Sequence, residues 1–333
     1  MKKVIKALFV VAAAFIVIGI IRSTIQVKPS GLSGAKEIVR TVTNVEAATN
    51  EAETFQTKQI PAVEPKSLSY DDKVRITYID VGQGDSTLIS LDGYNMLIDT
   101  GTYEAYDNVQ STLSESGVNS IDTLVLTHPD ADHIQNADEI IRDYNVGEVL
   151  LTNTEKDTKS YQDLNKAIEQ YDVPTAYPTA GREFSVGNAY FTILGPKQDA
   201  IYEDTNSYSI IIKMVYGNTS FLFLGDATGE EIEDIPKADF TANVYKAAHH
   251  GSANCGCNSS SLLSAVSPEY MVISCAYQND YGHPHRETMQ LAKEYNLKLY
   301  RTDLQGSVTC VSDGNTLAWS DEPSSNYICG SDE

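Results

Sequence analysis

The stretch Thr127-His128-Pro129-Asp130-Ala131-Asp132-His133 places two histidines and two aspartates within six residues. It follows the apolar run 121–126, which predicts a short buried β-strand because it is rich in β-branched and aliphatic residues. Apolar residues then recur at helical spacing from Ile134 to Ile141, so the stretch is a strand-to-helix loop that presents side chains to solvent. Histidine and aspartate suit Zn²⁺ or Mn²⁺. The pattern therefore predicts a metal site; an acidic surface turn with incidental histidines is the alternative.

The other histidines occupy the same kind of position. All six fall in three groups, each after a strand-like run and before a loop with Gly or Pro: His128 and His133, His249 and His250, His283 and His285. Asp226 follows a similar apolar run at 221–224. Scattered structural histidines would not be expected to share this position. A metal centre assembled at the ends of several strands requires it.

Strand-like and helix-like segments alternate from Lys73 onward. Residues 74–79 alternate with period two, and helical spacing is found at 107–116 and 160–171. Further strand-like runs lie at 87–90, 96–98, 121–126, 210–215, 220–224, 244–248 and 271–274. This alternation predicts an α/β layered domain.

Six motifs occur in a fixed order along this segment. They are Asp80-Val81-Gly82-Gln83-Gly84-Asp85-Ser86, Asp99-Thr100-Gly101, the H-x-D-x-D-H loop at 128–133, Leu224-Gly225-Asp226, His249-His250-Gly251-Ser252 and Tyr281-Gly282-His283-Pro284. Over residues 73–320 they resemble the metallo-β-lactamase-fold hydrolase domain of the ComEC-type DNA-internalisation competence proteins. The resemblance implies an αββα sandwich, two mixed sheets flanked by helices, with one site at their joint edge. Asp130 stands where many superfamily members carry a second histidine, as it does in the competence branch.

Two divalent ions, Zn²⁺ or Mn²⁺, are the expected cofactors, and no organic cofactor is expected. Two neighbouring ions need a shared carboxylate and roughly three further ligands each. The expected ligands are His128, Asp130, Asp132, His133, Asp226 and His249. The first two suit one ion, the next two suit the other, and Asp226 is the bridge. The superfamily's third-motif histidine has no counterpart between His133 and His249, so one ion is under-ligated or is completed by Asp130.

The expected catalytic residues are Asp132, His250 and His283. Adjacent residues at a strand end face opposite ways, so only one of His249 and His250 is expected to bind metal. His249 is assigned to the metal, and His250 is assigned to a substrate oxyanion. His283 precedes Pro284 and a helix N-terminus that favours an anion, so a ligand role and a phosphate-contact role both stay open.

Two further aspartates lie in turns that contain glycine. Asp85 and Asp99 could each serve only as turn formers, because aspartate hydrogen-bonds readily to its own backbone. The resemblance implies instead that both lie behind the metal ligands and support them.

The N-terminal region differs from the rest of the chain. Three lysines precede the uncharged, largely apolar run 7–21, which predicts a signal-anchor or a signal peptide over residues 1–26. Residues 27–72 are rich in Thr, Glu, Ala, Ser and Pro, which indicates a disordered linker. The hydrolase domain spans 73–320, and 321–333 is a C-terminal tail. The lysines favour a cytoplasmic N-terminus, so the catalytic domain is expected outside the cell membrane on a single span, or secreted if the segment is cleaved.

The resemblance implies a metal-dependent extracytoplasmic hydrolase, a phosphodiesterase or nuclease that acts on DNA with a metal-bridged hydroxide as nucleophile. The charge opposes this substrate, because 46 acidic against 24 basic side chains give −22, and DNA affinity comes mainly from Lys and Arg. The acidity favours a small or cell-wall phosphoester, such as teichoic-acid phosphorylcholine. A non-enzymatic surface binding protein is a third alternative.

Five cysteines lie in the last third of the chain, at 255, 257, 275, 310 and 329. In an exported protein this spacing favours disulfides. A Cys255–Cys257 disulfide is expected, with a thiolate ligand to zinc as the alternative because both cysteines follow His249 and His250. A Cys310–Cys329 pairing would attach the tail to its preceding strand.

Overall fold

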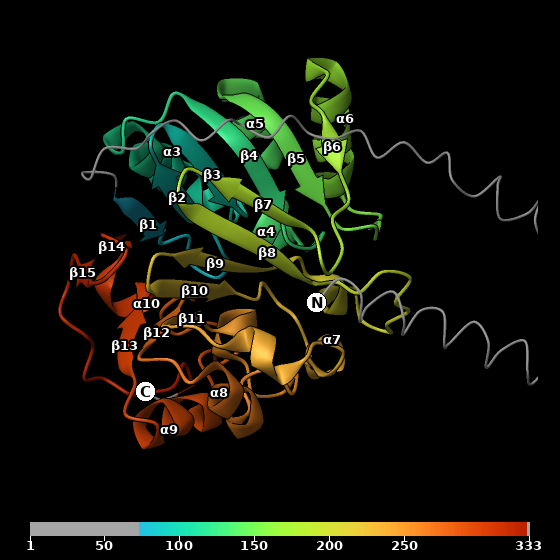
Figure 1. Cartoon of the computed structure of the whole chain (residues 1–333). Coiled ribbons are helices and arrows are strands. Elements are labelled where there is room, and N and C mark those ends of the chain that lie inside the picture. Colours follow the sequence, from blue (N-terminus) through green and yellow to red (C-terminus); the bar gives the residue numbers. More distant parts are fainter. Residues whose placement is uncertain (1–72, 332–333) are drawn as a thin grey trace, which may run out of the picture. The chain divides into compact units, whose positions relative to one another are not determined.

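Two mixed β-sheets lie at the centre of the structure, a computed structural model that describes residues 73–331 (Figure 1). The first sheet has the order β15-β14-β1-β2-β3-β4-β5-β6 and the second β13-β12-β11-β10-β9-β8-β7. The strands of the first sheet are β1 (Val74–Tyr78), β2 (Thr87–Leu91), β3 (Tyr94–Ile98), β4 (Ser120–Leu126), β5 (Asn145–Leu151), β6 (Thr175–Ala176), β14 (Val308–Ser312) and β15 (Leu317–Trp319). Those of the second are β7 (Glu183–Val186), β8 (Ala189–Gly195), β9 (Ile211–Tyr216), β10 (Thr219–Phe223), β11 (Val244–Lys246), β12 (Tyr270–Ile273) and β13 (Lys298–Arg301).

Helices cover the outer face of each sheet. The α-helices are α3 (Tyr106–Glu115), α4 (Ala131–Ile134), α5 (Ala137–Asp143), α6 (Lys159–Tyr171), α7 (Gly229–Glu233), α8 (Ser260–Val266), α9 (Arg286–Glu294) and α10 (Thr302–Gln305). Short 3₁₀ turns are η1 (Tyr103–Ala105), η2 (Thr205–Tyr208), η3 (Lys237–Phe240) and η4 (Ala248–Gly251). The helices expected at 107–116 and 160–171 correspond to α3 and α6.

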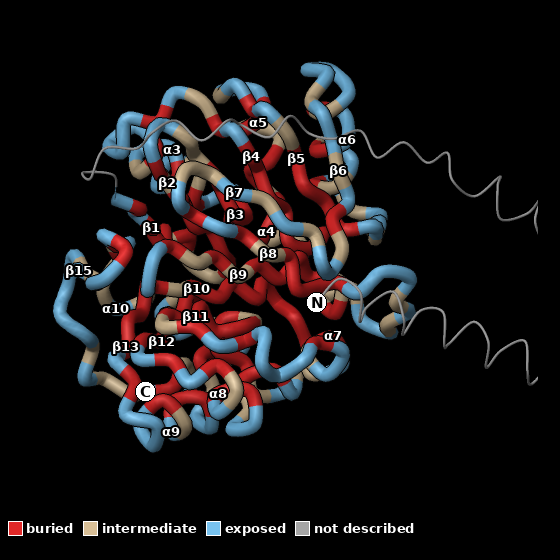
Figure 2. The backbone as a smooth tube through the Cα atoms, in the orientation of Figure 1, coloured by how far each residue is buried: buried red, intermediate tan, exposed pale blue. Residues whose placement is uncertain are grey.

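Alternating strand residues create the layers. On β10, Phe221 and Phe223 join the core between the sheets, whereas Leu222 joins the core under α8 and α9. On β3, Leu97 faces the other way from its neighbours and packs in the core beneath α3, α5 and α6. The red tube segments of Figure 2 trace these buried strands. The result is the expected αββα sandwich, and burial on both faces explains why the central strands are apolar throughout.

Strand register brings the motif loops to one edge. The parallel pairing of β3 with β4 aligns Ile98 with Val125, which places Asp99 beside Thr127. The parallel pairing of β10 with β11 aligns Phe223 with Lys246, so the loops after these strands also lie side by side. Carboxyl ends of parallel strands are the usual position for a site in an α/β protein.

The C-terminal tail packs against the domain. Ser324 N–H donates to the Leu299 carbonyl on β13, and the guanidinium of Arg301 donates to the Ile328 carbonyl. The expected Cys310–Cys329 disulfide is wrong. Cys310 is a free thiol buried between the sheets, whereas Cys329 packs in the core under α8 and α9.

The expected signal-anchor at 1–26 and linker at 27–72 lie outside the described residues. Within residues 73–331, no helix combines the length and the apolar character that a membrane span requires.

Candidate metal centre

The loop after β4 is held from behind by one aspartate. The carboxylate of Asp99 accepts hydrogen bonds from the backbone N–H of Thr127 at 2.8 Å and from its hydroxyl at 2.8 Å. The same carboxylate lies 2.7 Å from His133 Nδ1, which leaves Nε2 of that ring facing the cluster. A carboxylate behind an imidazole fixes the ring's orientation and tautomer, as metal-binding histidines require. Asp99 thus lies in the supporting position that the resemblance implies.

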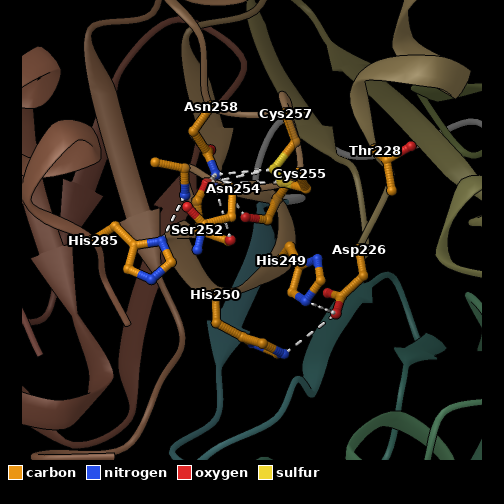
Figure 3. The surroundings of a disulfide bond; sticks show 12 residues. Asp226, Thr228, His249, His250, Ser252, Asn254, Cys255, Cys257, Asn258 and His285 are labelled. Carbon is orange, nitrogen blue, oxygen red and sulfur yellow. Dashed lines mark hydrogen bonds and ion pairs between the residues drawn. A yellow bond between two sulfur atoms is a disulfide. The ribbon is translucent and has the colours of Figure 1, made fainter. Parts of the chain in front are cut away.

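The second histidine pair lies in an unusual backbone turn after β11. Both His249 (φ 49°) and His250 (φ 54°) are in the left-handed region, which costs non-glycine residues roughly 1–2 kcal/mol each. Asn258 compensates by donating to the carbonyls of Ala248 (2.8 Å) and Ser252 (2.6 Å), on either side of the turn. In Figure 3 both histidine rings point toward Asp226 as a result.

The first group of candidate ligand atoms comprises Asp132, His133, Asp226 and His250, whose atoms all lie within 4.8 Å of one another. His250 Nε2 lies 3.1 Å from Asp132 Oδ2 and 3.5 Å from Asp226 Oδ2. His133 Nε2 lies 3.2 Å from Asp226 Oδ1. Two ligands bound tetrahedrally at about 2.1 Å are roughly 3.4 Å apart, so these spacings fit one ion.

A second group surrounds the other side of the same aspartate. Asp226 Oδ2 lies 3.9 Å from His128 Nε2 and 3.6 Å from His249 Nε2. Asp130 Oδ1 is 4.0 Å from His128 Nε2. Asp226 is therefore placed to bridge two positions, and His249 lies beside the second of them.

The electrostatics of the cluster favour a cation. Burial, with the neighbouring His133 ring, lowers the pKa of His128 to about 4, so its Nε2 lone pair is available at neutral pH. Burial alone would raise the pKa of Asp226, but the surrounding histidines hold it well below its ordinary value. Nε2 of His128 is buried, and no described residue hydrogen-bonds to it, while the buried Nε2 of His133 and Oδ1 of Asp226 face each other at 3.2 Å without the geometry of a hydrogen bond. Buried polar atoms normally have partners, and a divalent ion would supply them.

This geometry bears on the assignments expected for His249, His250 and Asp130. The prediction that only one of His249 and His250 could face the metal assumed an extended strand end, and the left-handed turn removes that assumption. His250, assigned to a substrate oxyanion, lies in the tighter group, while His249 lies in the looser one. Asp130 Oδ1 is 2.5 Å from Lys156 Nζ as well as near His128, so Asp130 has a cationic partner of its own.

The remaining expected residues lie around this cluster. The ring of His283 packs 5.6 Å from His249 and 6.0 Å from His250, measured between centroids. Asp85 does not reach the cluster directly; its N–H donates to the Asp132 carbonyl at 3.2 Å and its carboxylate pairs with buried Lys246 at 2.6 Å. The expected Cys255–Cys257 disulfide is confirmed, and it lies just beyond the histidine turn (Figure 3).

A family model for the metallo-beta-lactamase superfamily matches residues 79–256, more than half of the chain. The chain belongs to the metallo-beta-lactamase superfamily. The matched region includes the loop at 127–133, Asp226 and both residues of the histidine turn, and it stops before His283.

Competence proteins are among the relatives of this metallo-beta-lactamase chain. ComE operon protein 3 of Bacillus subtilis is 25% identical over 70% of this chain and 32% of that protein. Competence protein ComA of Neisseria gonorrhoeae is 29% identical over 72% and 32%, and recombination protein 2 of Haemophilus influenzae is 28% identical over 70% and 28%. The chain spans about a third of the length of these relatives. The resemblance to the ComEC-type hydrolase domain is confirmed.

Solved structures with the same fold are more distant. The metallo-beta-lactamase fold protein YhfI from Bacillus subtilis aligns with a TM-score of 0.49 at 9% identity, over 74% of this chain and 99% of that one. The metallo hydrolase Igni18 from Ignicoccus hospitalis aligns with a TM-score of 0.47 at 15% identity, over 71% and 98%.

Four residues that support the metallo-beta-lactamase site were not predicted from sequence. They are Gln83, Lys156, Lys246 and Asn258. Gln83 lies inside a motif that sequence analysis singled out, so its position was a usable signal. Lys246 is a charged residue in an otherwise apolar strand, which indicates a buried partner. The other two lie in loops without any pattern.

Proposed function

We propose that this chain is a two-metal phosphodiesterase that hydrolyses DNA on the outer side of the cell membrane. The observation that carries the proposal is Asp226, a buried carboxylate that lies between the two groups: its Oδ1 faces His133, and its Oδ2 faces His128, His249 and His250. When bound, two divalent ions such as Zn²⁺ or Mn²⁺ would supply an activated water and a clamp on the phosphate oxygens.

The chain's own residues would divide the remaining tasks. Asp132, His133 and His250 would hold one ion with Asp226, while His128, Asp130 and His249 would hold the other. Asp99 orients the His133 ring. The turn at His249 and His250 keeps two rings on one carboxylate, which a strand end could not do.

DNA as the substrate is supported by the relatives and by the surface beside the site. The relatives are named for competence and recombination, both processes that act on DNA. Tyr277 and Tyr281, in the loop that carries His283, are 64% and 67% exposed. Exposed aromatic rings beside a phosphodiester site suit stacking on the bases of a single strand.

The test is hydrolysis by the purified full chain loaded with Zn²⁺ or Mn²⁺. We expect cleavage of labelled single-stranded DNA and of bis(4-nitrophenyl) phosphate, and loss of both activities in His250→Ala with the fold retained. Ser324→Ala, in the tail, is the control and should keep full activity. A metal-free protein with undiminished hydrolysis would refute the proposal.

A small or cell-wall phosphoester is the second candidate, and the net charge of −22 is the observation that favours it. An enzyme for a small ester should be nearly indifferent to salt, whereas DNA binding should weaken steeply as salt rises. Brisk release of phosphorylcholine from teichoic acid without any DNA cleavage would establish this candidate. If neither substrate is hydrolysed while metal is bound, the alternative of a surface binding protein gains support.

The location outside the membrane is part of the proposal. The Cys255–Cys257 disulfide supports it, because disulfides persist mainly in oxidising compartments. External protease should remove the domain from intact cells. An anchored protein should remain with washed membranes and keep Lys2 and Lys3, whereas a cleaved one should be found in the medium. Protection from external protease would contradict the location.

A further inference from the structure

His283 lies beside the candidate metal centre, in the loop between β12 and α9. It is 5% exposed, and its ring packs near those of His249 and His250. Tyr281 stacks on the same ring at 5.7 Å between centroids. Within residues 73–331, the ring's hydrogen-bond partner is Gln83, whose Nε2 lies 3.3 Å from Nδ1 of His283.

The orientation of the Gln83 amide follows from its other contact. The backbone N–H of Ala276 donates to Gln83 Oε1 at 3.3 Å. A backbone N–H can only donate, so the amide oxygen must face Ala276 and the amide NH₂ must face the histidine. Exchanging the two atoms would place a donor against a donor.

The tautomer of His283 follows from the amide. An NH₂ group can only donate, so Nδ1 of His283 must be the acceptor and must carry no proton. A neutral imidazole then carries its single proton on Nε2. A ring without a proton on Nδ1 is neutral, because the charged imidazolium form carries a proton on both nitrogens.

We propose that Gln83 is a positioning residue that holds His283 as a neutral Nε2–H donor beside the metal centre, where that N–H donates to an oxygen of the bound phosphoryl group. A metal ligand needs a nitrogen lone pair. Because Nδ1 of His283 accepts from Gln83, the other ring nitrogen is Nε2, and Nε2 carries the proton. His283 is therefore a substrate contact and not a ligand. The inference rests on the proposed function for the identity of the bound group, but the tautomer itself does not.

The tautomer is measured directly by ¹⁵N NMR of the full chain with labelled histidine, in metal-free and Zn²⁺-loaded forms. The chain has six histidines, and His283→Asn identifies the signal by its loss. We expect a protonated Nε2 and an unprotonated Nδ1. Gln83→Glu offers an acceptor at the same place, so it should give a protonated Nδ1. A wild-type ring protonated on Nδ1 would overturn the proposal, whether or not any substrate is known.

Kinetics and metal content test the role. Losing one oxyanion donor costs about 10²–10³-fold in kcat, so His283→Asn and Gln83→Glu should lower kcat on bis(4-nitrophenyl) phosphate with KM little changed. Both variants should keep the wild-type metal content. Gln83→Met removes the hydrogen bonds without adding charge. Its kcat should lie between that of the wild type and those of His283→Asn and Gln83→Glu. Gln305→Glu, a second bridging glutamine whose hydrogen bonds join Arg301 and Glu322, is the matched control and should leave kcat unchanged.

Each failure has its own meaning. Loss of a metal ion in His283→Asn would make His283 a ligand and refute the proposal. An unchanged kcat in Gln83→Glu, with the tautomer inverted, would also refute it. A wild type that hydrolyses no phosphodiester would refute the proposed function, while the NMR result would still decide whether Gln83 sets the tautomer.

Discussion

Lys156 is a partly exposed cation that pairs with Asp130 at the candidate metal centre. Its Nζ lies 2.5 Å from Asp130 Oδ1, and its side chain is 35% exposed, so a phosphate can reach it. If Lys156 contacts DNA, Lys156→Ala should weaken DNA binding about tenfold, or ~1.4 kcal/mol. It should also reduce the slope of the logarithm of the DNA-binding constant against the logarithm of the salt concentration by about 1. Metal content should not change. Lys159→Ala, which removes an exposed lysine paired with Asp163, is the control. Equal losses of DNA affinity in the two variants would indicate an effect of the net charge of the protein and not a specific contact of Lys156.

The sequence did not predict the backbone conformation of the turn at His249 and His250. His249 and His250 were correctly placed near the site, but their directions depend on φ angles that neither residue type predicts. The left-handed turn is held by Asn258, which in turn accepts from the Tyr245 hydroxyl at 2.6 Å. These contacts span up to 13 residues, so no local pattern could predict them.

Among the elements, a buried ion pair links the two halves of the site. Lys246 on β11 pairs with Asp85, whose N–H holds the Asp132 carbonyl, and Lys246 also donates to the carbonyl of Ala247 before the histidine turn. Gly84 lies against the same Asp132 carbonyl, where a Cβ would approach its oxygen to 2.4 Å. The pair therefore sets the spacing between Asp132 and the histidines.

Breaking this pair should affect stability and metal binding separately. Lys246→Met leaves an unpaired buried carboxylate and should cost about 3–5 kcal/mol of unfolding free energy, measured by urea denaturation. Lys246→Met with Asp85→Leu should recover most of that loss but not the metal affinity, measured by chelator competition. Arg301→Met breaks a comparable buried pair with Asp303 and is the control. If it lowers metal affinity as much as Lys246→Met, the positioning role is wrong.

The buried carboxyl on α7 predicts a dependence of stability on pH. Burial raises the pKa of Glu231 well above its usual value near 4.5. The folded state therefore binds more protons than the unfolded state above pH 4.5, and stability falls as pH rises toward the raised pKa. Glu231→Gln removes this loss. Urea denaturation should show that the unfolding free energy of the variant rises relative to that of the wild type from pH 5 to pH 8. If the two free energies change with pH in parallel, Glu231 does not have a raised pKa.

Several strands were predicted well from their apolar runs, and others were missed. The expected runs at 87–90 and 220–224 match β2 and β10 within a residue or two. β7 (Glu183–Val186) was not predicted, because it is short and half exposed at the end of its sheet. The longer and mostly buried β5 and β8 were also missed. The layer arrangement came from the family resemblance, since periodicity alone cannot say which strands pair.

At the scale of the whole molecule, the metal centre joins the two sheets. Asp132 and His133 follow β4 of the first sheet, whereas Asp226 and His250 follow β10 and β11 of the second.

Ions that bind only the folded state stabilise it by about 2.7 kcal/mol at a hundred times Kd. Each kcal/mol shifts Tm by about 2–4 °C in a domain of this size. Chelation should therefore lower Tm by about 5–10 °C for each ion removed, and Zn²⁺ or Mn²⁺ should restore it. Asp226→Asn weakens both groups of ligands at once, so its Tm should respond little to chelator or metal. Arg301→Met, which lowers stability without touching the ligands, should keep the full metal response. A full response in Asp226→Asn would mean that the ions bind elsewhere, and the bridge between the sheets would have to be abandoned.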